Sequence, residues 1–350
     1  MCLQINENLT HPSFPILITG SYDRTARVWN LETGKQIHCL EGHTSAIRSL
    51  QFDEVKLVTG SMDRTIRIWN WRMGTCLRIL EGHTEGIVCV NFDADVLASG
   101  SVDTTIKIWD FRNGGVFTLR GHTDWVNCVQ LWDSSSGAIS SPPTPGRTQL
   151  GTSPSSAIAN LDWTSEEHQS STSPNINCGK MLFSASDDGT IRLWDLSSRT
   201  CVRDFTGHVG QVQTLKLSYM ERLLPECKRR VSASKGDRDI NTLSAPSHTS
   251  DDTSLPDRGP VLISGSLDNT IKTWDINTGK AMKTCFGHIE GVWSVAADRM
   301  RLISGSHDRT IKASSLLFLL DDLILIIMGC RSGTANKVGA PPRWLGIEVQ

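Results

Sequence analysis

Histidine, a serine or threonine, and aspartate recur together along this 350-residue chain, and these are the residue types of a hydrolytic triad. Each histidine follows a glycine, each hydroxyl residue stands four positions before its aspartate, and a tryptophan stands six positions after that aspartate. The complete sets are His43, Thr59, Asp63 and Trp69; His83, Ser99, Asp103 and Trp109; His122, Ser184, Asp188 and Trp194; and His208, Ser264, Asp268 and Trp274. A nucleophile is needed once, whereas this set occurs four times.

A structural role explains the repetition better than catalysis. Hydrogen bonds from the tryptophan indole through the hydroxyl and imidazole to the carboxylate would join two strands and a loop, and would satisfy polar groups that packing buries. We therefore predict that the sets stabilise the fold and that the protein is not an enzyme. The sequence has no phosphate-binding loop, no dinucleotide fingerprint and no Cys/His cluster with metal-ligand spacing, so we expect no cofactor and no metal site.

The elements that would position these residues repeat with a period of about forty residues. Trp29, Trp69 and Trp109 are forty residues apart. In the unit from 41 to 80, short runs with alternating apolar residues lie between Gly- and Asp-containing turns, at 46–52, 56–60, 65–69 and 76–80. The opening Gly-His and the closing Trp-Asp or Trp-Asn resemble the WD40 repeat, which implies an all-β propeller with one four-stranded blade per unit.

Two longer intervals interrupt this period. Trp109 and Trp194 are 85 residues apart, and Trp194 and Trp274 are 80 apart, so each interval holds one repeat and an insert. The inserts, at about 133–179 and 218–260, are polar and cannot bury enough apolar surface to offset chain entropy. We predict that both are disordered loops.

The two terminal units are less complete than the others. The first shows only Thr19, Asp23 and Trp29, and in the last Ser314 stands where tryptophan is expected, after His288, Ser304 and Asp308. We therefore predict an incomplete WD40 propeller over residues 1–312, with about four full blades and two partial ones. Residues 313–350 are predicted to be a non-repeat tail, which we interpret as an artefact of the gene model, such as a reading-frame slip or retained intron.

Composition limits the classes of binding partner and the cellular locations that are expected. A net charge of −2 gives no general attraction to nucleic acid, and the apolar stretch 315–328 is too short for a membrane helix and contains Asp321 and Asp322. We expect neither a nucleic-acid nor a membrane partner. The ten cysteines form no CxxC pair and there is no signal peptide, which favours a reduced protein in the nucleus, the cytoplasm or both. Several cysteines fall in strand-like runs and are expected to be buried, namely Cys39, Cys89, Cys128, Cys201 and Cys285.

Partner-binding residues are expected around the central channel of a propeller, just after each Gly-His pair and just before each turn aspartate. Exposed tryptophan and arginine are typical of binding hot spots. The main candidates are Trp125, Trp293 and Arg48, followed by Tyr22, Asn127, Gln211 and Gln213. Because Arg48 is the one arginine at these positions, we predict a face of mixed aromatic and amide character and not a phosphate clamp. The alternative at each position is a strand-end residue packed on a neighbouring blade.

Several runs resemble one family, the fungal sulfur-controller F-box/WD-repeat proteins. They are LRGHTDWVNCV at 119–129, FSASDDGTIRLWDL at 183–196, FTGHVGQVQ at 205–213, SGSLDNTIKTWDINTGK at 264–280 and FGHIEGVWSVAADRMRLISGSHD at 286–308. The resemblance covers about 17–312 and implies the substrate-receptor subunit of a cullin-based (SCF) ubiquitin ligase that regulates sulfur metabolism. The propeller would then hold a protein target, and an F-box would recruit the adaptor and cullin.

No F-box precedes the first repeat of this sequence, so the adaptor and cullin are expected as partners only if the true gene encodes an F-box upstream. Two alternatives stay open. One is a WD40 scaffold unrelated to ubiquitin, and the other is a truncated fragment without a function.

Overall fold

The structure, a computed structural model, describes residues 2–6, 12, 14–134, 179–218, 260–298, 301–315 and 345–348. The two predicted disordered inserts and most of the predicted tail lie outside the described residues. Two short pieces of the tail are described: residues 313–315 end a strand of the last sheet, and residues 345–348 form another strand beside it. No helix in the described ranges is long and apolar enough to cross a membrane.

The described residues form six antiparallel sheets, each of four strands. The first sheet contains β1 (Cys2–Asn6), β2 (Ile16–Gly20), β3 (Ala26–Asn30) and β4 (Gln36–Leu40). The second contains β5 (Ile47–Phe52), β6 (Leu57–Ser61), β7 (Ile66–Asn70) and β8 (Thr75–Leu80). The third contains β9 (Ile87–Phe92), β10 (Val96–Ser101), β11 (Ile106–Asp110) and β12 (Val116–Leu119).

The remaining three sheets follow the same order. The fourth contains β13 (Val126–Asp133), β14 (Lys180–Ser186), β15 (Ile191–Asp195) and β16 (Thr200–Phe205). The fifth contains β17 (Val212–Ser218), β18 (Val261–Ser266), β19 (Ile271–Asp275) and β20 (Ala281–Cys285). The sixth contains β21 (Val292–Ala297), β22 (Arg301–Ser306), β23 (Thr310–Ser315) and β24 (Leu345–Glu348).

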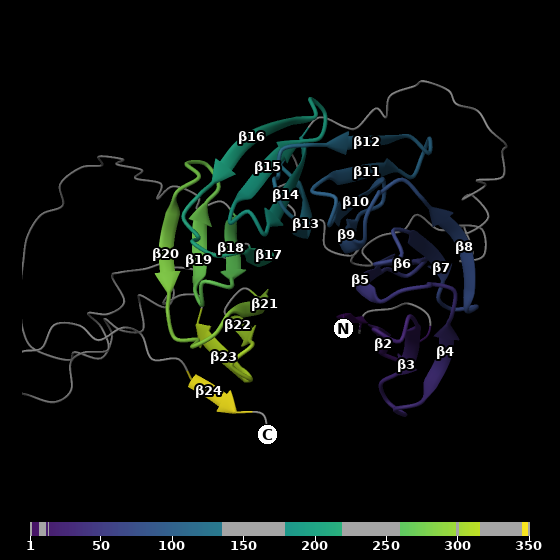
Figure 1. Ribbon diagram of the computed structural model, residues 1–350. Coiled ribbons are helices and arrows are strands. Elements are labelled where there is room, and N and C mark those ends of the chain that lie inside the picture. The colour runs from purple at the N-terminus through teal and green to yellow at the C-terminus, as the bar shows by residue number, and fades with distance from the viewer. Residues whose placement is uncertain are drawn as a thin grey trace, which may run out of the picture.

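The all-β propeller expected from the repeats is confirmed, with six blades that follow one another along an arc (Figure 1). The expectation of four full and two partial blades is not confirmed, because both terminal sheets have four strands. The first unit gains its fourth strand from β1. The last gains it from β24, which pairs with β23 from Thr310 opposite Glu348 to Ala313 opposite Leu345.

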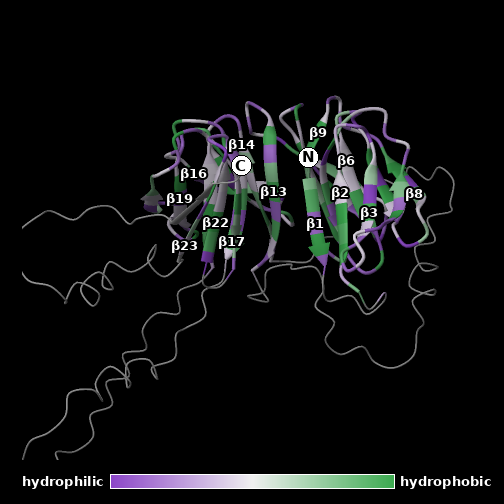
Figure 2. Ribbon diagram, turned by 90° about the horizontal axis from the view of Figure 1, so that it is seen from below, coloured by the Kyte–Doolittle hydropathy of each residue, from purple (hydrophilic) through white to green (hydrophobic). Residues whose placement is uncertain are grey.

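Apolar residues at alternate positions of the strands make the contacts between blades. Figure 2 shows the strands side by side with hydrophobic and hydrophilic residues alternating along many of them. Each of the five hydrophobic clusters among the described residues joins two successive blades, as where Leu40 of the first blade packs with Ile47 and Trp69 of the second. None of these clusters joins the first blade with the sixth.

The outer faces of the two terminal blades are exposed where the same positions of inner blades are buried. Leu3 of β1 is 64% exposed, whereas Leu50, its counterpart in β5, is 9% exposed. On the sixth blade Ile303 and Ile311 are each 43% exposed, and their counterparts in the second blade, Val58 and Ile66, are fully buried. Each inner blade is therefore covered on both faces, and each terminal blade on one.

The expectation that five strand cysteines are buried is correct for only part of the set. Cys89 and Cys285 are buried and Cys128 is partly buried, but Cys39 and Cys201 are exposed. The exposed pair lie on β4 and β16, the outermost strands of their blades, where only alternate residues turn toward a neighbour. A strand-like pattern predicts burial less well at the rim than near the channel.

Candidate protein-binding face and the networks behind it

A chain of hydrogen bonds in the second blade links the residues of the first complete set. The Trp69 indole N–H donates to Thr59 Oγ1 at 2.9 Å, and the Thr59 hydroxyl lies 2.8 Å from His43 Nε2. His43 Nδ1 lies 2.7 Å from Asp63 Oδ2. Because a carboxylate only accepts, Nδ1 carries the proton and Nε2 accepts from the hydroxyl. We call this arrangement the blade network.

The blade network recurs with nearly the same geometry in the third, fourth and fifth blades. The imidazole–carboxylate distances are 2.8 Å for His83 and Asp103, 2.8 Å for His122 and Asp188, and 2.7 Å for His208 and Asp268. The indole N–H of Trp109, Trp194 and Trp274 donates to Ser99, Ser184 and Ser264 at 2.8–2.9 Å. Each network joins the loop after Gly-His to the turn and to two strands of the blade.

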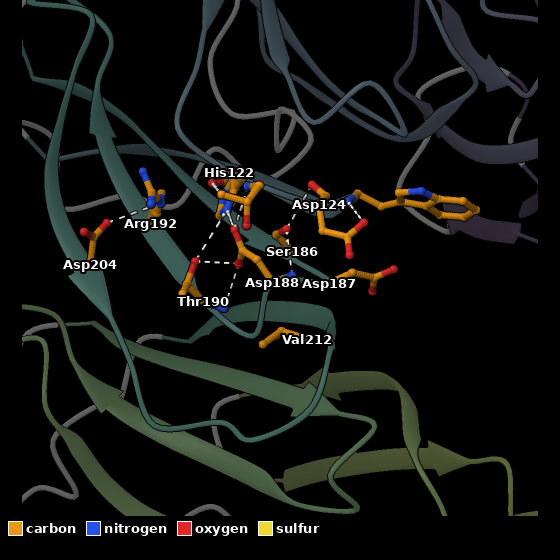
Figure 3. Close-up of polar contacts among 12 residues, drawn as sticks. His122, Asp124, Ser186, Asp187, Asp188, Thr190, Arg192, Asp204 and Val212 are labelled. Atoms are coloured by element: carbon orange, nitrogen blue, oxygen red, sulfur yellow. Dashed lines mark hydrogen bonds and ion pairs between the residues drawn. The ribbon is translucent and has the colours of Figure 1, made fainter.

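The turn aspartate is the electrostatic centre of each network. Burial raises the pKa of Asp188, but hydrogen bonds from His122 and Thr190 outweigh it and hold that pKa well below its usual range. Figure 3 shows His122 and Thr190 converging on Asp188. In the other complete networks, the histidine and threonine of the same blade likewise depress the pKa of the turn aspartate, at Asp63, Asp103 and Asp268. Folding therefore favours the ionised carboxylates.

The serine and threonine hydroxyls of the networks are enclosed. Thr59, Ser99, Ser184 and Ser264 have no exposed surface, so a substrate carbonyl has no approach to their oxygens. Within the described ranges, no group of three or more His, Cys, Asp or Glu residues is placed to hold a metal ion. This geometry supports the structural role that the repetition predicts, and that role stays a prediction for mutagenesis to test.

The terminal blades carry reduced versions of the blade network. In the first blade Trp29 donates to Thr19 at 3.0 Å, and exposed Asp23 pairs with Arg27 at 3.2 Å. In the sixth blade His288 still contacts Asp308 and Ser304, at 2.9 and 2.8 Å. Ser314 stands at the tryptophan position of the sixth blade, and its buried Oγ has no hydrogen-bond partner among the residues that the structure describes.

The loops after Gly-His and the aspartate turns lie at the same edge of the blades, and we call this edge the turn face. The backbone N–H of Thr44, in the first such loop, donates to Asp63 at 2.9 Å, which fixes this proximity. All the predicted partner-binding residues belong to these loops and turns or to the strand starts beside them, so the structure places them on the turn face.

Two of the candidates pair with each other across the first two blades. Arg48 donates a hydrogen bond to the Tyr22 hydroxyl, and its guanidinium carbon lies 5.8 Å from the centre of the Tyr22 ring. The guanidinium is therefore partly engaged within the protein, and Tyr22 remains 62% exposed. This pairing is consistent with the prediction of an aromatic face at this end.

Two further candidates converge on a residue that was not among the predicted ones. The Asn127 and Gln213 side-chain amides both donate to Asp187 Oδ1, Gln213 at 2.9 Å. Asp187 precedes the turn aspartate, the register position that Tyr22 occupies in the first blade. That register could have identified Asp187. Its contact with Gln213, however, joins the fourth blade to β17 of the fifth, and a contact between blades is not visible in the repeat.

The remaining candidates are exposed. Trp125 and Trp293 are 40% and 48% exposed, and Gln211 is exposed as well. The Trp293 ring lies 6.3 Å from that of His307, which in turn contacts Glu290 at 2.9 Å. His307, like Asp187, stands at the register position before the turn aspartate and was not among the predicted residues. The structure thus places all seven candidates on the turn face, and some of them contact one another or share a partner.

Comparison with known proteins identifies the repeats. The family described as WD domain, G-beta repeat matches residues 2–30, 34–70, 74–110, 115–141, 161–195, 225–275 and 279–313. The segments 115–141 and 161–195 both fall in the first long interval, which runs from Trp109 to Trp194, and together supply the strands of one repeat, so seven segments correspond to six repeats.

Curated relatives cover much of the chain. It is 42% identical over 323 residues to a "Probable E3 ubiquitin ligase complex SCF subunit sconB" of Emericella nidulans, an alignment that covers 87% of this chain and 40% of the relative. It is 43% identical to the protein of the same name from Aspergillus clavatus, over 86% of this chain and 39% of the relative. It is 39% identical to an F-box protein of Saccharomyces cerevisiae, over 55% of this chain and 24% of the relative. The chain spans less than half the length of each.

Proposed function

The chain belongs to the WD40 repeat family, and from this premise we propose that it is the substrate-recognition propeller of an SCF ubiquitin ligase that regulates sulfur metabolism. The observation that carries the proposal is an identity of about 42% with proteins named as SCF subunits, which extends over 87% of the chain. The turn face then binds the protein target, and ubiquitin transfer is done by another subunit.

The chemistry of the turn face supports protein binding. Tyr22, Trp125 and Trp293 offer large exposed aromatic surfaces, which is the type of side chain that dominates binding energy in interfaces. The hydroxyls of the four complete networks are buried, so they are not available to a substrate. A binding role, not a catalytic one, accounts for both observations.

The chemistry of the turn face also bears on the class of target. Arg48 is already hydrogen-bonded to Tyr22, and Asn127 and Gln213 present amides around a carboxylate. A phosphorylated peptide needs several converging arginines. We propose that recognition does not depend on phosphate. Strong phosphate dependence that Arg48→Ala alone abolishes would contradict this part of the proposal.

A capture experiment tests the proposed function. The chain would be immobilised and exposed to extract from a sulfur-replete fungal culture, in parallel with a Trp125→Ala/Trp293→Ala variant and with Met73→Ala. Met73 is an exposed residue in the turn between β7 and β8, at the opposite edge of its blade, so its variant is the matched control. We expect a defined set of proteins that the double variant loses and the control keeps.

The partners expected from the relatives' names are the SCF adaptor and cullin. A second capture would use a longer protein that carries an F-box in front of these repeats. Recovery of the adaptor and cullin would support the ligase, and their absence would favour a WD40 scaffold unrelated to ubiquitin. Equal capture by all three proteins would contradict protein binding at the turn face. We further propose a nuclear or cytoplasmic location, which fluorescence microscopy of the tagged protein in a fungal cell would test.

We also propose that the six blades are an open part of a larger ring. The exposed Leu3 side of the first blade and the Ile303 side of the sixth are the two halves of the interface that successive inner blades bury. Exposed faces of this kind associate. Light scattering should detect self-association that Leu3→Lys or Ile303→Lys reduces, and a monomer at all concentrations would contradict the open ring.

A further inference from the structure

Asp187 is a carboxylate held in a fixed place on the turn face. It belongs to the turn between β14 and β15 of the fourth blade, where Asn127 of the same blade and Gln213 of the fifth donate to its Oδ1 atom, Gln213 at 2.9 Å. Its backbone N–H donates to the Trp125 carbonyl at 2.9 Å. Two amide side chains from neighbouring blades thus fix the direction of one carboxylate oxygen.

The other oxygen of this carboxylate has no partner within the described ranges, and no Lys, Arg or His there forms an ion pair with Asp187. Its neighbour in the chain, Asp188, is different, because His122 and Thr190 occupy both of its oxygens. Figure 3 shows the Asp187 side chain lying apart from the contacts around Asp188. Among the described residues, Asp187 is thus the carboxylate of the pair that has no basic partner.

The pKa values of the two aspartates are shifted in opposite directions, upward for Asp187 and downward for Asp188. Burial raises the pKa of Asp187 above its usual value, and the nearby Asp124 and Asp188 carboxylates add to this although Asn127 and Gln213 oppose it. A half-buried carboxylate in a negative field is costly, and a positive charge beside it would recover that cost. The site therefore favours a cation.

The same register position in other blades contains no such group. Met62 lies against the position where Gly86 would carry a Cβ atom, and Leu267 lies against Gly291 in the same way, so these apolar side chains cover the neighbouring loop. Met62 and Leu267 thus serve packing between blades, whereas Tyr22 and His307 at the same position are polar and exposed. Asp187 belongs with the second kind, because it presents a polar group on the turn face and makes no such apolar contact.

An exposed aromatic residue lies next to Asp187 in the fold. Trp125 is hydrogen-bonded to Asp187 through the backbone, and its side chain is 40% exposed on the same face. A carboxylate accepts from an ammonium or guanidinium group, and an indole attracts the same cation over its ring and packs on the aliphatic stem. Together they offer polar and apolar contacts to a long basic side chain.

We propose that Asp187 and Trp125 receive a lysine or arginine side chain of the protein segment that binds the turn face. The inference rests on the proposed function, because it assumes that a target occupies this face. It adds the chemistry of one contact. The bound segment carries a basic residue that reaches the fourth blade, while the Arg48 end of the face lies over the first two blades.

A random-peptide phage library is the probe that tests this contact. The purified chain, Asp187→Asn and Glu85→Gln would each be used for selection, followed by affinity measurement with the selected synthetic peptides. Asp187→Asn removes the charge but keeps an oxygen that accepts from the two amides. Glu85→Gln removes a charge from the loop before β9 on the same face and is the matched control.

We expect peptides with a preferred Lys or Arg at one position. Asp187→Asn should weaken their binding about tenfold to a hundredfold, as for loss of one charged hydrogen-bond partner, and Glu85→Gln should change it by less than about threefold. A peptide whose basic residue is changed to Glu should bind Asp187→Lys more tightly than the original peptide does. The thermal midpoints of the variants show whether each has folded.

Two results would overturn the inference in distinguishable ways. Selected peptides that lose affinity on Trp125→Ala but show no basic preference and no response to Asp187→Asn would leave the proposed function standing and remove this contact. Peptides that respond to neither change, or a selection that yields no peptide, would remove the proposed binding face together with the contact. Equal losses of peptide affinity for Asp187→Asn and Glu85→Gln would show that the peptide responds to the overall negative charge of the face and not to an ion pair with Asp187.

Discussion

The inner blades and the terminal blades are built from the same repeat but differ in how completely they are enclosed. In the second to fifth blades, each complete network lies in a sheet that neighbours cover on both faces. Among the described residues no histidine joins the network of the first blade, serine replaces tryptophan in the sixth, and each of these blades has one exposed face. The comparison separates two sources of stability, packing between blades and hydrogen bonds within a blade.

The turn aspartates show what enclosure does to a polar group. The side chain of Asp23 in the first blade is 46% exposed and pairs with Arg27, whereas that of Asp188 is 8% exposed and bound to His122. A surface ion pair contributes little, while a buried hydrogen-bonded carboxylate is costly to disturb. The same residue type in the same register is therefore expected to matter much more in an inner blade.

The largest effect is expected from removing an enclosed tryptophan. Trp274→Ala should lower the free energy of unfolding by about 3–5 kcal/mol, because it leaves a cavity beside Phe205 and His208 and removes a hydrogen bond. Trp29→Ala, in the first blade, should cost distinctly less because that side chain is already partly exposed. Denaturant titrations of both variants check this, and equal losses would erase the distinction between inner and terminal blades.

The next effect concerns the carboxylates themselves. Asp188→Ala should cost about 2–4 kcal/mol, because it leaves His122 and the Thr190 hydroxyl without their acceptor. Asp23→Ala is the matched control and should cost about 1 kcal/mol or less. The measurement is the thermal midpoint of each variant. An unchanged midpoint for Asp188→Ala would mean that the network is not structural.

Acid should destabilise the inner blades through the same aspartates. Their folded-state pKa values lie below the unfolded value of about 3.9, so the stability they contribute is full above that pH and is lost as pH falls toward the folded values. We expect thermal midpoints to decline below about pH 4, and less steeply in Asp188→Asn. A decline that is equally steep in this variant would remove Asp188 from the explanation.

The smallest effect should come from restoring the missing tryptophan. Ser314→Trp would offer an indole N–H to Ser304, as Trp274 does to Ser264 in the fifth blade, and should stabilise the protein by about 1 kcal/mol. Ser314→Ala is the control, and it should be nearly neutral because the Ser314 hydroxyl has no partner within the described ranges. Destabilisation by Ser314→Trp would show that the sixth blade has adapted to the smaller residue.

The parts of the fold that could be predicted from the sequence are those built from the repeated residues. Gly-His, the turn aspartate and the tryptophan predicted the propeller and the residues that meet in each network, because the four-residue spacing from hydroxyl to aspartate recurs in all six blades and the tryptophan follows in five of them. The strand at 345–348 does not resemble the repeat, so the fourth strand of the last sheet was not foreseen. Exposure of Cys39 and Cys201 was missed because alternation does not say which face of an outer strand is covered.

The turn face was predictable in position but not in its contacts. Register placed Arg48, Asn127 and Gln213 there, yet the contacts of Arg48 with Tyr22 and of Gln213 with Asp187 join different blades. Such contacts depend on the angle between neighbouring blades, which no single repeat encodes. The repeat pattern therefore predicts which residues lie on this face, but it does not predict the side-chain contacts that they make with other blades.

The most direct test of the account is amide hydrogen exchange on the chain with and without the protein that it captures most strongly. If the turn face is the binding face, protection should increase at 44–48, 124–127, 211–213 and 291–293 and should stay unchanged on the outer strands β4, β8, β12 and β16. Protection confined to those outer strands would place the partner on the rim and contradict the account.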